Sequence, residues 1–171
     1  MKQSYNLLTV LSVTSCVTII SCNKSISAED KAAQEQANAF QASILNHTYH
    51  LVSYYSDKPI DYNPYDNVVK SETDLNIYVL PYLWDDQYVY GADGNLQIVQ
   101  GDNKIPGNSA PIINFNYKIG VKTGTVFFDY FDYYYKPMEY SLTTFNDSLF
   151  IINVPGPQGS RLFSKFLRIQ K

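Results

Sequence analysis

The chain has 171 residues, a formal net charge of −3 at pH 7 and two cysteines. Its acidity is weak and its 13 Lys and Arg residues form no cluster, which argues against a nucleic-acid partner and against electrostatic docking on anionic lipid. The 16 Tyr, 9 Phe and one Trp are residues that favour strands, so the composition predicts a mainly β protein.

Residues 1–21 have the pattern of a lipoprotein signal peptide. Lys2 supplies a positive start, an apolar stretch runs from Leu7 to Ile20, and Ile-Ile-Ser before Cys22 has the form of a bacterial lipobox. At about 14 residues, the stretch is shorter than the roughly 20 that a membrane-spanning helix needs. We therefore expect cleavage before Cys22 and lipid attachment, such as palmitate, to that cysteine.

A second lipobox, which ends at Cys16, is a weaker alternative. Cleavage there would leave an apolar mature N-terminus, whereas cleavage before Cys22 leaves the solvated tether Asn-Lys-Ser. With one cysteine discarded and the other lipidated, the exported domain contains no disulfide. The protein is then anchored to a membrane of the cell envelope by covalent lipid, facing the periplasm or the exterior.

Residues 22–46 are expected to form this lipidated tether and one helix, over residues 28–45. Ser27 can cap the helix, and apolar residues recur at helical spacing at Ala33, Ala37, Phe40 and Ile44. Because this stripe is narrow and rich in alanine, we expect the helix to pack lightly and not to organise a core.

From residue 47 to residue 171 the apolar period changes to two, which is typical of an all-β domain. Turn residues such as Asp93-Gly94 and Asn146-Asp147 separate the apolar runs. The pattern predicts an up-and-down antiparallel β-barrel of eight or nine strands, with a two-sheet β-sandwich as the alternative fold. The expected strands are residues 48–56, 76–80, 86–91, 95–100, 111–120, 124–135, 138–145, 148–154 and 161–169, and the long connections are residues 57–75 and 101–110.

Three stretches carry a family resemblance: His47 to Ser53, Asp85 to Leu96, and Tyr140 together with Asn-Asp-Ser-Leu at residues 146–149. They resemble the lipocalin-like domains of small Bacteroidota outer-membrane lipoproteins. Tyr replaces the usual Trp at position 49 and the usual Phe at position 90, and the cysteine pair of some relatives is missing. The resemblance implies a lipocalin-type barrel on the outer membrane, and it implies no reaction.

The predicted strand 124–135 is aromatic on both faces. Alternate residues face opposite sides, which separates Val126, Phe128, Tyr130, Asp132 and Tyr134 from Phe127, Asp129, Phe131, Tyr133 and Tyr135. Since neither set is polar, we expect the helix, a long loop, a partner or a ligand to cover the outer face. The rings are either wall material for the barrel or a binding surface, because tyrosine pairs an apolar body with a polar tip.

Candidate ligand-binding residues follow from this strand and from the resemblance. Trp84 is placed near the barrel opening or in the segment before the third strand, with plain packing as the alternative. The complete candidate set is Trp84, Tyr88, Tyr90, Phe128, Tyr130, Asp132 and Tyr134.

Metal, cofactor and catalytic chemistry find little support in the sequence. His47 and His50 are expected on opposite faces of a strand, and the loop from Asp61 to Asn67 lacks the glycine and distal glutamate of a calcium loop. Hydrolase signatures are fragmentary, and the adjacent carboxylates Asp85 and Asp86 should point apart. We expect no enzyme, no metal and no cofactor.

The leading hypothesis is a lipid-anchored, non-enzymatic barrel that binds a small or apolar molecule in its cavity. The alternative is an envelope interaction module with a filled barrel, whose aromatic outer patch binds a partner protein or a glycan. Small inward residues would leave room for a ligand, whereas the mostly large inward residues favour a filled or shallow-cupped barrel.

Overall fold

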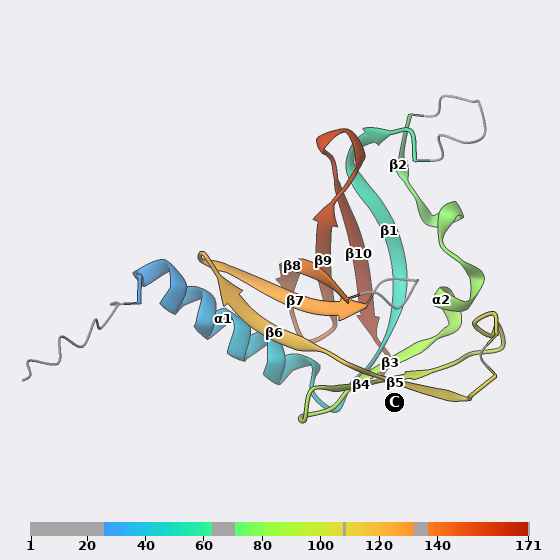
Figure 1. Cartoon of the computed structure of the whole chain (residues 1–171), viewed down its shortest axis with the longest axis horizontal. Coiled ribbons are helices and arrows are strands. Elements are labelled where there is room, and N and C mark those ends of the chain that lie inside the picture. Colours follow the sequence, from blue (N-terminus) through green and yellow to red (C-terminus); the bar gives the residue numbers. More distant parts are fainter. Residues whose placement is uncertain (1–25, 63–70, 108, 132–136, 171) are drawn as a thin grey trace, which may run out of the picture.

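The computed structural model describes residues 26–62, 71–107, 109–131 and 137–170, with side chains omitted at 130, 131 and 137 (Figure 1). The predicted signal peptide and the lipid-attachment residue Cys22 lie outside these residues, as do Asp132 and Tyr134. The described part is mostly β, with one N-terminal helix and a nearly closed antiparallel barrel. The barrel prediction is confirmed, and the sandwich alternative is not observed.

Helix α1 spans Ala28–Ile44, close to the predicted 28–45. The Oγ atom of Ser27 accepts a hydrogen bond from the backbone N–H of Asp30 at 3.0 Å, as expected for an N-cap. Three short helices, η1 (Asn76–Tyr78), α2 (Pro81–Asp85) and η2 (Pro157–Gly159), lie between strands.

The barrel wall follows the antiparallel order β5-β4-β3-β1-β10-β9-β8-β7-β6, and β2 pairs separately with β1. Most neighbours in this order are consecutive in the chain, as in a meander, and the long strand β1 joins the two runs by pairing with both β3 and β10. The strands are β1 (Thr48–Ile60), β2 (Glu72–Asp74), β3 (Gln87–Tyr90), β4 (Asn95–Val99), β5 (Ile112–Asn116), β6 (Lys118–Lys122), β7 (Thr125–Phe131), β8 (Pro137–Phe145), β9 (Leu149–Pro155) and β10 (Arg161–Arg168).

Tyr117 is the corner at which the barrel nearly closes. Strands β5 and β6 are at opposite ends of the strand order, yet this one residue separates them in the sequence. Its backbone N–H donates to the carbonyl of Gly94 at 2.8 Å, and its hydroxyl donates to the carbonyl of Gly91 at 2.8 Å. The predicted single strand 111–120 is therefore wrong, because the chain changes its pairing partner at Tyr117 while the alternation continues.

The predicted strand 76–80 is also wrong. Residues 76–78 form η1, and Pro81 begins α2 as its first helical residue, a position that proline favours. The side-chain Oδ1 of Asn76 accepts from the backbone N–H of Tyr54 at 2.7 Å, so an amide oxygen takes the place that a neighbouring strand would fill. Part of the predicted loop 57–75 is instead the end of β1 and the short strand β2.

Helix α1 contributes directly to the core, contrary to the expectation of light packing. Phe40 and Ile44 have no exposed surface, and the ring of Phe40 lies 5.8 Å from that of Phe128 and 5.5 Å from that of Phe150. The one large ring of this alanine-rich stripe, that of Phe40, is enough to join the helix to the core, because the small residues let the helix approach the strands closely.

The two faces of the aromatic strand β7 are covered by different means. Helix α1 covers the inward side through Phe128. On the outward side the ring of Phe127 lies across the neighbouring strand at Gly120, where a Cβ atom would meet the ring at 2.5 Å. The outward ring of Phe127 is therefore partly buried against the backbone of β6 at Gly120, and not against the helix.

Candidate functional site

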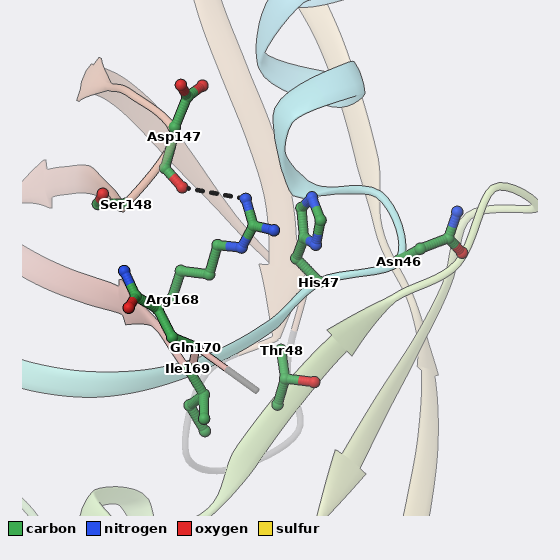
Figure 2. A pocket seen from close by; sticks show the side chains of 8 residues that line it. All are labelled: Asn46, His47, Thr48, Asp147, Ser148, Arg168, Ile169 and Gln170. Carbon is green, nitrogen blue, oxygen red and sulfur yellow. Dashed lines mark hydrogen bonds between the residues drawn. The ribbon is translucent and has the colours of Figure 1, made fainter.

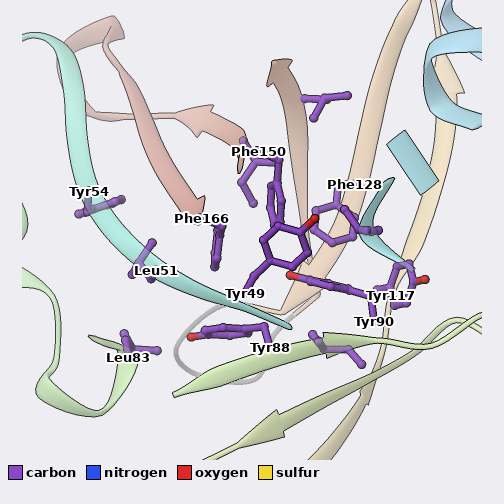
Figure 3. Packing of buried hydrophobic residues seen from close by; sticks show 14 of the residues in the cluster. Tyr49, Leu51, Tyr54, Leu83, Tyr88, Tyr90, Tyr117, Phe128, Phe150 and Phe166 are labelled. Atoms are coloured by element: carbon purple, nitrogen blue, oxygen red, sulfur yellow. The ribbon is translucent and has the colours of Figure 1, made fainter. Parts of the chain in front are cut away.

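The closed end of the barrel is filled by an aromatic floor, which we define as Tyr49, Tyr90, Phe128, Phe150 and Phe166 (Figure 3). Each of these side chains is at most 4% exposed. Phe150 lies at the centre, with its ring centroid 4.7 Å from that of Phe166 and 5.0 Å from that of Tyr49. Edge-to-face and stacked contacts of this kind add to the free energy gained by burial.

A second group of inward residues, which we call the barrel mouth, consists of Tyr140, Val154 and Ser164. Residues directly opposite each other in antiparallel strands share a face. Ser164 is opposite the buried Ile152, Val154 is opposite Leu162, and Tyr140 is opposite Phe128. All three mouth residues therefore point inward, yet each remains partly exposed to solvent. At these three residues the inner wall is therefore less completely buried than at the aromatic floor.

Three of the predicted ligand-binding residues pack in or against this floor. Tyr90 and Phe128 belong to it and are in contact, with ring centroids 5.8 Å apart. Tyr88 packs edge-on against Phe166, with ring centroids 5.4 Å apart. These rings are 2% exposed or less, so they offer little surface to a ligand.

Of the remaining predicted residues, one lies in a short helix and the others lie partly or wholly outside the described atoms. Trp84 is in α2, half-buried against the core. Tyr130 is in β7, but its side chain is not described. Sequence reasoning did not select Val154 or Ser164. Ser164 carried a usable signal, since it is a small residue at an inward position among large ones.

The hydroxyl groups of the floor differ in their hydrogen bonding. The Tyr49 hydroxyl donates to the backbone carbonyl of Ser43 at 3.1 Å. The Tyr90 hydroxyl is fully buried and has no hydrogen-bond partner among the described residues. Burial raises the pKa of both tyrosines, and raises that of Tyr90 well above its usual value. Both therefore stay neutral, and neither is poised as a proton-transfer group near pH 7.

The carboxylates of Asp85 and Asp86 both accept hydrogen bonds from the same loop, at residues 101–103. The Oδ1 atom of the fully buried Asp86 accepts from the backbone N–H of Gly101 at 3.1 Å. The Oδ2 atom of Asp85 accepts from the backbone N–H and the side-chain amide of Asn103, both at 2.8 Å. Gly101 is needed here because a Cβ atom would lie 2.4 Å from Cγ of Asp85.

The pKa of Asp86 is raised to about 6, mainly by burial; the hydrogen bond from Gly101 lowers it, the charge of Asp85 raises it and the charge of Lys104 lowers it. The second oxygen of Asp86, Oδ2, has no partner among the described residues. This carboxyl group is therefore buried, and it takes part in a hydrogen bond that holds the loop at Gly101.

A separate polar pocket of about 510 Å³ lies near the C-terminal end of β10 (Figure 2). Its lining residues are Asn46, His47, Thr48, Asp147, Ser148, Arg168, Ile169 and Gln170. His47 lines this pocket beside Arg168.

Within residues 26–62, 71–107, 109–131 and 137–170, no three His, Cys, Asp or Glu side chains are placed to share a metal ion. No helix in the same ranges has the length and apolar character needed to cross a membrane. No protein-family model matches the chain, and no curated protein matches it.

Proposed function

We propose that this protein binds a small, largely apolar molecule at the barrel mouth, above the aromatic floor. The observation that carries the proposal is that Tyr140, Val154 and Ser164 point inward and are nevertheless reached by solvent. A shallow cup with an apolar base and a few polar groups on its wall is the usual form of a small-molecule site. The Ser164 hydroxyl supplies one such polar group.

The binding function fits a non-enzymatic role. The buried tyrosines have raised pKa values, and Asp86 accepts a hydrogen bond from the backbone of a loop. These groups therefore fit a structural role better than a role in proton transfer. The resemblance to lipocalin-like lipoproteins supports the same role, and we propose with it an outer-membrane location through a lipid at Cys22. Substitution Cys22→Ala should abolish incorporation of labelled palmitate and move the protein from the membrane fraction to the soluble one.

The ligand test is a titration of the full chain, in a mild nonionic detergent, with fatty acids, a hydrophobic dye and oligosaccharides. The emission of Trp84, the one tryptophan, and the melting temperature are the two readouts. A ligand that binds only the folded state raises the melting temperature by mass action. A saturable response to the fatty acids or the dye supports the proposal.

A pair of variants locates the response. Ser164→Phe adds a ring to the inner wall and should weaken apolar binding at least about tenfold by filling the cup. Thr144→Phe adds the same ring to an exposed position of β8 and should leave binding unchanged. Equal effects of the two substitutions, or no response to any apolar ligand, would contradict binding at the barrel mouth.

One observation favours a second function on the outer face of the barrel. The rings of Tyr55 and Phe163 stack in parallel at 5.0 Å and both are partly exposed. Beside them Nε of Arg161 donates to Oδ1 of Asn153 at 2.6 Å, which leaves a polar cluster next to an aromatic platform. An interaction module for a glycan or partner protein would use this surface. A response to oligosaccharides that Tyr55→Ala removes and Ser164→Phe preserves would favour it.

A further inference from the structure

The polar pocket at the end of β10 has walls that backbone hydrogen bonds hold in place. The N–H of Arg168 donates to the carbonyl of Ser148 at 2.7 Å, and the N–H of Ile169 donates to the carbonyl of Thr48 at 2.8 Å. These bonds join the β8–β9 turn, the start of β1 and the end of β10 around one space. The pocket is therefore built by tertiary pairing and not by one loose loop.

Arg168 is the main charge in this pocket, and among the described residues its guanidinium makes one hydrogen bond. Its Nη1 donates to the backbone carbonyl of Asp147 at 3.3 Å. No carboxylate among the described residues lies within 4.0 Å of the guanidinium, and Figure 2 shows the carboxylate of Asp147 turned away from it. A partly buried guanidinium held at one nitrogen presents its other N–H groups to the pocket.

The other polar groups of the pocket add hydrogen-bond donors around Arg168. The imidazole of His47 lies beside the guanidinium in Figure 2, and Ser148 and Gln170 line the same space. The charged or titratable groups that line it are Arg168, His47 and Asp147, and they come from the end of β10, the segment before β1 and the β8–β9 turn. Ile169 supplies an apolar wall.

The field of Arg168 also reaches the floor of the barrel. Burial raises the pKa of Tyr49, and the charge of Arg168 opposes that increase. The chain as a whole carries a net charge of −3, and long-range attraction of an anion is therefore weak. Any anion held here must be recognised by local geometry.

We propose that this pocket binds a small molecule through an oxyanion, either a carboxylate or a phosphate, which Arg168 holds with two parallel hydrogen bonds. The planar fork of arginine matches both groups. The volume of about 510 Å³ lies within the range of small-ligand pockets and leaves room for the rest of such a molecule against Ile169. The site is separate from the barrel mouth and does not depend on the function proposed there.

The test is a calorimetric titration of the full chain in detergent with inorganic phosphate, with succinate and with short-chain phosphatidylglycerol, each compared with chloride at equal ionic strength. Arg168→Gln should reduce affinity for the binding anion at least about tenfold, and Arg168→Lys should recover only part of it because lysine lacks the fork. Arg161→Gln, on the outer face, is the matched control and should change affinity less than about twofold. A response to the lipid alone identifies a headgroup as the source of the oxyanion.

Amide chemical-shift mapping of the unmodified chain provides an independent measurement that does not rely on variants. The largest shifts on anion addition are expected at residues 46–48, 147–148 and 168–170. No saturable binding beyond chloride, shifts elsewhere on the surface, or equal losses in Arg168→Gln and Arg161→Gln would each overturn the proposal. Because apolar ligands of the barrel mouth are absent from this titration, its failure leaves the function proposed there unaffected.

Discussion

The aromatic floor and the barrel mouth share the inward face of β9 and β10, yet the floor residues are buried and the mouth residues are partly exposed. Along β9 the exposed fraction is 0% at Phe150 and 1% at Ile152, whereas Val154 is partly exposed. Along β10 the buried Phe166 is followed, on the same face, by the partly exposed Ser164. The barrel is filled where rings meet and α1 adds Phe40, whereas Val154 and Ser164, beside the buried Leu162 and Ile152, are only partly buried.

The largest expected effect tests the floor. Phe150→Ala removes the central ring and should lower the free energy of unfolding by about 3–5 kcal/mol, because a large cavity would remain among rigid neighbours. Chemical denaturation monitored by circular dichroism measures it. A loss below about 1 kcal/mol would mean that the floor can collapse around the gap and is not closely packed.

A second test compares a buried charge with the apolar floor. The pKa of Asp86 is raised in the folded state from 3.8 to about 6, so the unfolded chain loses this proton first as pH rises. The group's contribution to stability therefore falls between about pH 4 and pH 6 and stays low above that range, by about 2–3 kcal/mol in all. Asp86→Asn should remove this pH dependence and be more stable than the unmodified chain at pH 7.

Urea unfolding of both proteins at pH 4, 5.5 and 7 checks this prediction. The difference in unfolding free energy between them should grow with pH and then level off. A difference that does not change with pH would show that Asp86 titrates normally and is not the buried acid that its surroundings imply.

A third test separates the two floor tyrosines by their hydroxyl groups. Tyr90→Phe should raise the free energy of unfolding by about 1 kcal/mol, because it removes a buried hydroxyl that has no partner among the described residues. Tyr49→Phe is the matched control and should lower stability by about 1 kcal/mol, since that hydroxyl donates to Ser43. Thermal unfolding of the pair measures both, and the same sign for the two variants would contradict this assignment.

The smallest effect is expected at the mouth. Val154→Ala removes methyl groups that solvent already reaches, so it should lower stability by less than about 1 kcal/mol. The same denaturation experiment that measures Phe150→Ala gives this value. A loss as large as that of Phe150→Ala would show that the mouth is packed as tightly as the floor.

Alternation predicted most of the wall and the inward rings of the floor. Phe128, Tyr88 and Tyr90 were selected from strand position and resemblance, and all three are buried in the core. The turns also followed from local chemistry: Gly94 has a positive φ of 78°, and the side chain of Asn146 accepts from the N–H groups of Ser148 and Leu149. These features depend on neighbours in the sequence, which is why they could be predicted.

The candidate sites depended on contacts between distant residues. Alternation shows which residues share a face but not which strand lies beside them, so it could not reveal the corner at Tyr117 or the exposure of Val154. Likewise, Arg168 and His47 are far apart in the sequence and line one pocket only because β1 and β10 are paired.

The sequence by itself therefore determined the β character, the turns and the inward faces, since each reflects local backbone preference and the two-residue period of a strand. Only the tertiary structure decided where the barrel is filled and where it is open, and which polar groups meet at the end of β10. The physical reason is that packing and pocket shape depend on side chains brought together by strand pairing, and that pairing joins residues far apart in the chain.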